Sequence, residues 1–430
     1  MLDPAVETRS WDEQLALDDA AYRNQIAYLF ERSPFYKDKL TAAGIDSPQA
    51  AGGLAEIARL PLTGKPEVKA TCTRANPFGA HLCVERPQIA RIYSTSGTTG
   101  TPSYIPLTAD DIDNWVTGSA RSYAASGVQA GQRVISTYNA GPFAAGAALA
   151  SFDRIGLTHI PLGTGNTELL VRAIELLEPE AAVLTPSYAA YLAESFELAG
   201  SSVARVLVAG EPGGGEPAFR AALEAAWGAR VTEAMGIGDI GVSLWGECEQ
   251  QDGMHLGARG FVHAELIDPG TGTGTATAMR DGATGELVLT HLRHRAAPLL
   301  RFRTRDHVNV RLSPCPCGRT GPRIRCVGRT DDMLVVRGVN VFPSAVREVV
   351  SAFRPEVSGH VLVKPRTAGV KQEPPLPVVV ELARGVEAGG ELAETIRSRL
   401  RDTLVVQARV ELVPWGTLRR SEYKSKLVET

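Results

Sequence analysis

The sequence contains no run of about 18 or more apolar residues, the length that a membrane-spanning helix needs. Residues 1–8 also lack the basic segment followed by an apolar stretch that marks a secretion signal. The six cysteines are too sparse to cross-link a chain of 430 residues, so reduced thiols or metal ligation are better interpretations than disulfides. We therefore expect a cytoplasmic protein with no membrane partner.

A large excess of charge of one sign is also absent. The chain has 45 basic and 48 acidic residues, a formal net charge of −3, and the two signs are mixed along its length. This argues against a nucleic-acid surface as the main partner and favours a small molecule, while a homodimer stays open. The apolar fraction of 44% and the charged fraction of 22% are ordinary for a globular chain of two or three domains.

Periodic patterns predict the element types. Trp11, Leu15 and Tyr22 recur at helical spacing and indicate an amphipathic helix that the pair Ser33-Pro34 ends. Between residues 91 and 240, short apolar runs alternate with helical patterns, which is typical of an α/β domain around a largely parallel sheet. The predicted strands there are 133–135, 183–184 and 206–208, and the predicted helices are 167–177, 187–198 and 217–227.

From about residue 328 the pattern changes to that of a compact α+β unit. Its predicted strands are 333–336, 360–363, 378–382 and 406–412, and its predicted helices are 345–353 and 391–404. We therefore predict an α/β fold with a large N-terminal domain of layered sheets and helices at 1–328, a hinge at 329–332 and a small mobile α+β C-terminal domain at 333–430.

The segment 93–102 is the most informative one in the chain. It reads Tyr-Ser-Thr-Ser-Gly-Thr-Thr-Gly-Thr-Pro. Backbone N–H groups and hydroxyls of such a turn can surround phosphate oxygens, and glycines permit close approach, although the same composition also marks simple turns. The segment lacks the Lys-Ser/Thr ending of a P-loop NTPase. The candidate phosphate-binding residues are Ser96, Gly97, Thr98, Thr99 and Gly100.

This turn resembles the phosphate-binding motif of the adenylate-forming superfamily, and its form is similar to that of the phenylacetate–CoA ligase family. Gly210-Glu211-Pro212 resembles the adenine-contacting turn of that family, and residues 235–239, Met-Gly-Ile-Gly-Asp, resemble its aromatic-Gly-x-Ser/Thr-Glu motif. Residues 301–306 resemble the segment whose aspartate holds the ribose hydroxyls. The matches occur in the family's order and span roughly residues 20 to 426.

Two further matches lie near the C-terminus. Residues 328–343 resemble the hinge and first strand of the family's mobile C-terminal domain, and residues 416–424 resemble the stretch that carries its catalytic lysine. The resemblance implies Lys424 as that lysine, with Lys426 as a minor competitor. It also implies ATP contacts from Arg329, a hinge at Asp331 and Asp332, and a thiol path beside Gly338.

The implied roles also make physical sense for the residue types. A carboxylate and the α-phosphate of ATP repel each other, so Lys424 would supply positive charge where the two meet. Asp306 can accept hydrogen bonds from two ribose hydroxyls, and Asp239 can hold Mg²⁺, which prefers oxygen ligands. The chain departs from the family pattern at several positions: Asp239 replaces Glu, Met235 replaces an aromatic residue, and Arg419 and Tyr423 replace Pro and Gly.

The resemblance implies a reaction. A carboxylic acid, expected to be aromatic, would be activated by ATP to an acyl-adenylate and transferred to a thiol, expected to be coenzyme A, with release of AMP and pyrophosphate. A carrier-protein arm or an amine as acceptor, and a non-catalytic nucleotide-binding homologue, stay open as alternatives. The candidate acid pocket consists of Tyr138, Phe143 and Gly236, although such a stretch is also common in plain packing.

A separate group of residues indicates metal ligation. Cys315 and Cys317 lie two residues apart, and Cys248 and His255 lie in one short segment. Three thiols and an imidazole form a closed tetrahedral ligand set of the kind that holds structural Zn²⁺, and some members of the family have a zinc at a similar pattern. Buried free cysteines are the alternative interpretation. Cys72, Cys83 and Cys326 are expected to be core or surface thiols.

Overall fold

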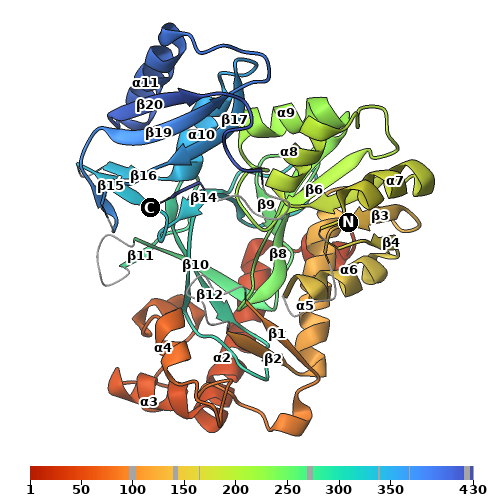
Figure 1. Cartoon of the computed structure of the whole chain (residues 1–430). Coiled ribbons are helices and arrows are strands. Elements are labelled where there is room, and N and C mark those ends of the chain that lie inside the picture. The colour runs from red at the N-terminus through yellow and green to blue at the C-terminus, as the bar shows by residue number, and fades with distance from the viewer. Residues whose placement is uncertain are drawn as a thin grey trace.

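A computed structural model provides the structure of the chain (Figure 1). It describes residues 1–95, 103–138, 144–163, 165–268, 275–337, 339–367, 369–420 and 427–429. The helices are α1 (Pro4–Glu7), α2 (Trp11–Arg32), α3 (Pro34–Ala42), α4 (Lys65–Ala70), α5 (Ala109–Ala125), α6 (Ala148–Ile155), α7 (Thr167–Leu177), α8 (Pro186–Ser195), α9 (Pro217–Trp227), α10 (Pro343–Ser351) and α11 (Gly390–Leu404). Short 3₁₀ turns occupy Leu54–Arg59, Arg86–Gln88 and Ala144–Ala147.

The strands divide into one large sheet and three small ones. The strands up to residue 291 are β1 (Arg91–Ser94), β2 (Tyr104–Leu107), β3 (Arg133–Ser136), β4 (Thr158–Pro161), β5 (Ala181–Leu184), β6 (Arg205–Ala209), β7 (Arg230–Ile237), β8 (Gly241–Glu247), β9 (Met254–Leu256), β10 (Val262–Asp268), β11 (Thr275–Thr277) and β12 (Thr284–His291). Those that follow are β13 (Phe302–Arg311), β14 (Arg323–Arg329), β15 (Leu334–Val336), β16 (Val339–Val341), β17 (Val357–Val363), β18 (Lys371–Gln372), β19 (Leu376–Leu382) and β20 (Ala408–Val413).

The large sheet has twelve strands in the order β11-β10-β12-β13-β14-β9-β8-β7-β6-β5-β3-β4. Strands β4, β3, β5, β6 and β7 run parallel, as predicted, whereas every pair from β7 to β11 is antiparallel. The largely parallel sheet predicted for residues 91–240 is therefore confirmed for β3 to β7, whereas β1 and β2 form a separate antiparallel pair. Short links such as the one from β7 to β8 have no room for the helical crossover that parallel strands require, so they form hairpins.

The predicted helices form where the sequence combines an apolar face with a cap. In α2, Ser10 accepts a hydrogen bond from the backbone N–H of Glu13, and Tyr22, Ile26 and Leu29 are buried on one face. Helix α8 ends at Ser195, three residues before the predicted end, because Phe196 is extended. The order of strands and helices agrees with the α/β prediction throughout this part of the chain.

The C-terminal residues form a compact unit with two three-stranded sheets, β17-β19-β20 and β16-β15-β18, and helices α10 and α11. Its valine-, leucine- and isoleucine-rich cluster, from Leu334 to Ala408, is separate from the clusters of the larger sheet. The last strand begins at Ala408 rather than at the predicted 406, because Val405 takes a left-handed conformation at the end of α11. Figure 1 shows this unit in blue beside α8 and α9.

Three acid–base contacts join this unit to the larger part. Arg347 of α10 pairs with Glu216 at the start of α9, at 2.9 and 2.6 Å. Glu194 of α8 contacts both His360 Nε2 and Arg420 Nε, each at 3.0 Å. The contacts hold one orientation of the small unit against α8 and α9. Within the described ranges, none of the helices is both long and apolar enough to cross a bilayer.

Candidate active site

The parallel strands bring several predicted residues to one edge of the sheet. Tyr138 follows β3, Gly210 follows β6, and Gly236 and Asp239 lie at and just after the end of β7. Because β3, β5, β6 and β7 are parallel, their carboxyl ends meet at the same edge, where open α/β sheets bind ligands. The sequence interpretation placed these residues in one site, and the topology gives the reason.

The predicted adenine turn is a tight turn held on both sides. Gly210 has a φ of +99°, a conformation that favours glycine. The Glu211 carboxylate accepts hydrogen bonds from the backbone N–H and the hydroxyl of Ser187 at the start of α8. The carbonyl of Pro212 accepts a hydrogen bond from Arg347 of the C-terminal unit at 2.7 Å. The turn therefore links the large sheet to α10.

A partly buried glutamate with an enclosed Oε1 lies beneath the same turn. Glu233 of β7 is so close to Gly214 and Gly215 that a Cβ on either would lie 2.7 Å from its side chain. Burial, and then the neighbouring Glu247 carboxylate, raise the pKa of Glu233, and Arg220 bonds Glu247 at 2.7 Å. The absence of side chains at 214 and 215 lets the loop lie directly on this group.

Gly236 is required by the close approach of strand β8. A Cβ at this position would lie 1.7 Å from the carbonyl oxygen of Val242. Any side chain would therefore push β7 and β8 apart at the edge where the predicted acid pocket lies. Met235, the neighbouring predicted residue, is partly buried and packs against the apolar cluster of the antiparallel half of the sheet.

Asp239, the predicted magnesium ligand, has a cation beside it that the sequence interpretation missed. Its Oδ2 lies 2.8 Å from the Nζ of Lys65, the first residue of α4, and Lys65 Nζ also lies 3.1 Å from Thr95 Oγ1. Thr95 directly precedes the predicted phosphate-binding residues. No periodic pattern or motif singled out Lys65, because only the tertiary fold brings 65 and 239 together.

The predicted ribose-binding carboxylate lies beside a second predicted residue. Asp306 of β13 and Arg329 at the end of β14 are direct neighbours in the sheet, and Arg329 Nη1 lies 2.8 Å from Asp306 Oδ1. Burial raises the pKa of Asp306 to about 6, and the charge of Arg329 opposes that rise. Arg329 also contacts Asp331 of the predicted hinge at 3.2 Å, whereas Asp332 has a pKa raised by burial.

Other predicted residues are placed only in part. Tyr138 shares a hydrogen bond with the buried Tyr123. Ser96, Gly97, Thr98, Thr99, Gly100, Phe143, Gly338 and Lys424 lie outside the described residues. Their roles stay predictions that depend on the sequence resemblance.

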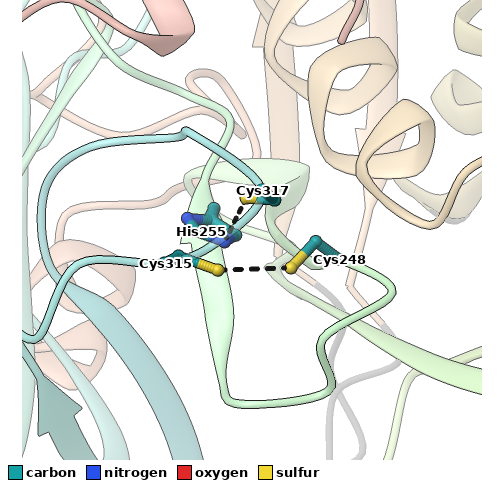
Figure 2. A group of neighbouring side chains, drawn as sticks. All are labelled: Cys248, His255, Cys315 and Cys317. Atoms are coloured by element: carbon teal, nitrogen blue, oxygen red, sulfur yellow. Dashed lines mark hydrogen bonds between the residues drawn. The ribbon is translucent and has the colours of Figure 1, made fainter.

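The predicted metal ligands come together in one cluster (Figure 2). One ligand atom from each of Cys248, His255, Cys315 and Cys317 lies within 4.8 Å of every other. Cys248 Sγ is 3.7 Å from Cys315 Sγ, and Cys317 Sγ is 3.4 Å from His255 Nε2. Strand β9 carries His255 and pairs with β14, so the loop before β14 lies beside it.

Cys248, His255 and Cys315 are buried, with exposed fractions of 2%, 5% and 7%. The hydrogen bond from the Cys248 thiol, followed by that from His255, lowers the pKa of Cys317, which favours the thiolate that a metal needs. Three sulfurs and an imidazole nitrogen at this separation fit a tetrahedral Zn²⁺. Asp239 is not part of this group, so a magnesium site and a zinc site would be separate.

Comparison with known proteins gives a matching domain family, relatives of similar sequence and solved structures of the same fold. The AMP-binding enzyme C-terminal domain family matches residues 338–429. A phenylacetate-coenzyme A ligase from Thermus thermophilus is 34% identical over 98% of this chain and 97% of its own length. The similarity thus covers both the large sheet and the C-terminal unit.

Solved structures of 2-hydroxyisobutyryl-CoA ligase have the same fold. In its postadenylation state, with the acyl-adenylate 2-HIB-AMP bound, that protein superposes with a TM-score of 0.89, at 26% identity over 99% of this chain and 91% of its own. In its thioesterification state, with CoA also bound, the TM-score is 0.72, at 27% identity and the same coverage. The arrangement of the two parts here is therefore closer to the postadenylation arrangement.

Proposed function

Because this chain belongs to the phenylacetate–coenzyme A ligase family of adenylate-forming enzymes, we propose that it activates a carboxylic acid with ATP and transfers the acyl group to coenzyme A. The observation that carries this proposal is the 34% identity over nearly the full length of both chains. The common edge that holds Gly210, Gly236 and Asp239 supports it, because a nucleotide and an acid have to meet at one place.

Two steps make up the reaction. In the first, an oxygen of the acid attacks the α-phosphorus of ATP, the bond from that phosphorus to the β-bridging oxygen breaks, and pyrophosphate leaves with the electron pair. In the second, the CoA thiolate attacks the acyl carbon and AMP leaves. Lys424 would neutralise the charge that builds up between carboxylate and α-phosphate, and Asp306 would accept the ribose hydroxyls.

The residues present fit a magnesium ion. Asp239 offers a carboxylate that Lys65 links to Thr95, the residue before the predicted phosphate-binding segment, and Mg²⁺ retains waters while it binds substrate phosphates, so one protein carboxylate is enough. Mg²⁺ would neutralise charge on the phosphates. The shorter side chain of Asp239, compared with the glutamate usual in the family, would hold the ion directly or through a water.

We propose an aromatic acid as the substrate. The Thermus thermophilus relative is named for phenylacetate, and its identity to this chain exceeds that of the 2-hydroxyisobutyryl-CoA ligase. Tyr138 and Phe143 would form aromatic walls, and Gly236, whose missing side chain lets the Val242 carbonyl of β8 approach, would contribute backbone to the pocket.

The C-terminal unit would move between the two steps. With a hinge at Asp331 and Asp332, rotation of residues 333–430 would withdraw Lys424 after adenylation and bring Gly338 to the path of the thiol. The higher similarity to the postadenylation structure than to the thioesterification structure supports two arrangements in this family.

The cysteine–histidine cluster would hold a structural Zn²⁺. Four protein ligands leave no open position for a substrate, so the ion would stabilise the fold rather than take part in the reaction. It would fasten the loop between β13 and β14 to β8 and β9.

Pyrophosphate release over a panel of aryl and alkyl acids, with CoA present or omitted, tests the function. We expect release with an aryl acid and thioester formation only with CoA. Pyrophosphate release without thioester formation would point to a carrier-protein arm or an amine as acceptor, and no pyrophosphate release with any acid of the panel would refute acid activation.

Lys424→Ala should abolish ATP–pyrophosphate exchange and leave thioester formation from preformed acyl-adenylate intact. An equal loss of both activities would contradict the role of Lys424.

A further inference from the structure

Helix α4 places an ammonium group at the start of the predicted phosphate turn. Lys65 Nζ lies between Asp239 Oδ2, at 2.8 Å, and Thr95 Oγ1, at 3.1 Å. The Lys65 side chain is 35% exposed and that of Asp239 is 17% exposed, so the pair stands at the wall of the site and not in the core. Both side chains line a small cavity of about 40 Å³ together with Ser103, Tyr104 and Phe302.

The backbone of Lys65 is held firmly. Thr63 adds to the start of β13: its N–H donates to the carbonyl of Arg301, and its carbonyl accepts from the N–H of Arg303. The Glu67 carboxylate caps the N-terminus of α4 at Gly64 and accepts a hydrogen bond from Lys39. These contacts fix the point from which Lys65 reaches Asp239.

We propose that Lys65 is a phosphate-binding residue, which binds the β- and γ-phosphate oxygens of ATP and stabilises the pyrophosphate that leaves. This inference rests on the proposed function and names a residue of that same site. An ammonium group has three N–H donors, so it can donate to a phosphate oxygen as well as to Thr95 and Asp239. Lysine is a common phosphate ligand because it presents a compact positive charge.

We assign Lys65 to the leaving group rather than to the acid, because its ammonium group contacts Thr95, which directly precedes the predicted phosphate-binding residues. When the bond between the α-phosphorus and the bridging oxygen breaks, negative charge accumulates on the pyrophosphate, and a fixed donor at that place lowers the barrier. No proton has to be transferred, since Lys65 acts as a charged donor throughout. In the second step no pyrophosphate is present, so Lys65 has nothing to bind.

Lys65 also provides a counterion for Asp239 when no nucleotide is bound. A partly exposed ion pair contributes little to stability. With MgATP, the Asp239 carboxylate would turn to the ion, and the ammonium would turn to the phosphates. Asp239 would thus contact the magnesium ion of MgATP, and Lys65 would contact its phosphate oxygens.

Lys65→Met and Lys65→Arg test the proposal. For Lys65→Met we expect kcat/KM for MgATP in ATP–pyrophosphate exchange to fall about 10²–10³-fold, the loss typical of one transition-state donor. Binding of inorganic pyrophosphate to the protein as purified, measured by calorimetry without added Mg²⁺ and without a chelator, should weaken in Lys65→Met. Thioester formation from added acyl-adenylate and CoA should stay near the wild-type rate, and Lys65→Arg should recover part of the exchange.

Lys37→Met, at an exposed lysine of α3, is the matched control and should behave as wild type. The inference is refuted by wild-type exchange in Lys65→Met, by unchanged pyrophosphate binding, or by an equal fall in both half-reactions, which would indicate a structural role. Wild-type protein that supports no exchange with any acid would instead refute the proposed function, so the two failures are distinguishable.

Discussion

The ion pair between Arg347 and Glu216 should control which half-reaction the enzyme can carry out. The guanidinium of Arg347 donates two hydrogen bonds to Glu216 and one to the Pro212 carbonyl, and it lies over the ring of Phe219 at 5.2 Å. The two side chains are only 5% and 10% exposed. Arg347 belongs to the C-terminal unit, whereas its partners belong to the loop between β6 and α9 and to α9 itself.

Removal of one partner leaves a buried charge without its counterion, which costs about 3–5 kcal/mol in the docked arrangement. Rotation of the C-terminal unit would expose that charge to water and avoid the cost. Since about 1.4 kcal/mol corresponds to a factor of ten, Glu216→Gln should shift the equilibrium away from the docked arrangement by roughly 10²- to 4 × 10³-fold. The Pro212 contact would be lost with the rotation, so the predicted adenine turn would lose its support from α10.

The assay compares the two half-reactions in Glu216→Gln and Arg347→Met. We expect ATP–pyrophosphate exchange to fall strongly, and thioester formation from synthetic acyl-adenylate to stay the same or to rise. Arg399→Met, at an exposed arginine of α11, is the control and should leave both rates unchanged. Unchanged exchange in both variants, or the same loss in both half-reactions, would refute the argument that this contact holds the docked arrangement and that exchange requires it.

Three further predictions follow from the site. Removal of zinc by a strong chelator should lower Tm, because a structural ion supplies folding free energy. Cys248→Ser should lower Tm by a similar amount that is not additive with chelation, whereas Cys72→Ser, at an exposed thiol, should leave Tm unchanged. Metal analysis that finds no zinc would contradict the assignment. Binding of adenosine should weaken as the pH falls below about 6, because burial raises the pKa of Asp306 to about 6 and only the carboxylate accepts both ribose hydroxyls. Because the pKa of Asp306 is raised, the folded state also gains stability at acid pH, and this gain is lost as the pH rises through about 6. Asp306→Asn should remove the pH dependence of adenosine binding and that of folding stability. An adenosine affinity of the wild type that does not depend on pH would exclude the assigned role. Gly236→Ala should lower the free energy of unfolding, measured with denaturant, by about 1–3 kcal/mol or more, because the new Cβ would collide with the Val242 carbonyl. Gly390→Ala, at a position with open space around it, should leave the free energy of unfolding unchanged. Equal stability of the two variants would rule out the crowding argument.

Local patterns predicted most of the α/β elements and, in the small α+β unit, both helices and four of the six described strands, all but β16 and β18. Helices 167–177 and 217–227 begin and end at the predicted residues, because their apolar spacing and their caps agree. The proximity of Cys248, His255, Cys315 and Cys317 was also predicted, since cysteine and histidine are few in this chain and metal chemistry narrows the choices among them. The antiparallel half of the large sheet was not predicted, because its strands are joined by short links without helices and their pairing is set at long range.

The sequence by itself indicated the chemistry of this protein: a segment rich in hydroxyl groups, ordered motifs over nearly the whole chain, and four candidate metal ligands. Only the tertiary structure decided which charges meet. Lys65 and Asp239 lie 174 positions apart, and Arg347 and Glu216 lie 131 apart, so no local periodicity relates them. An ion pair depends on distance in space, and sheet order and domain docking set that distance, which is why the cations beside Asp239 and the adenine turn became visible only in the folded chain.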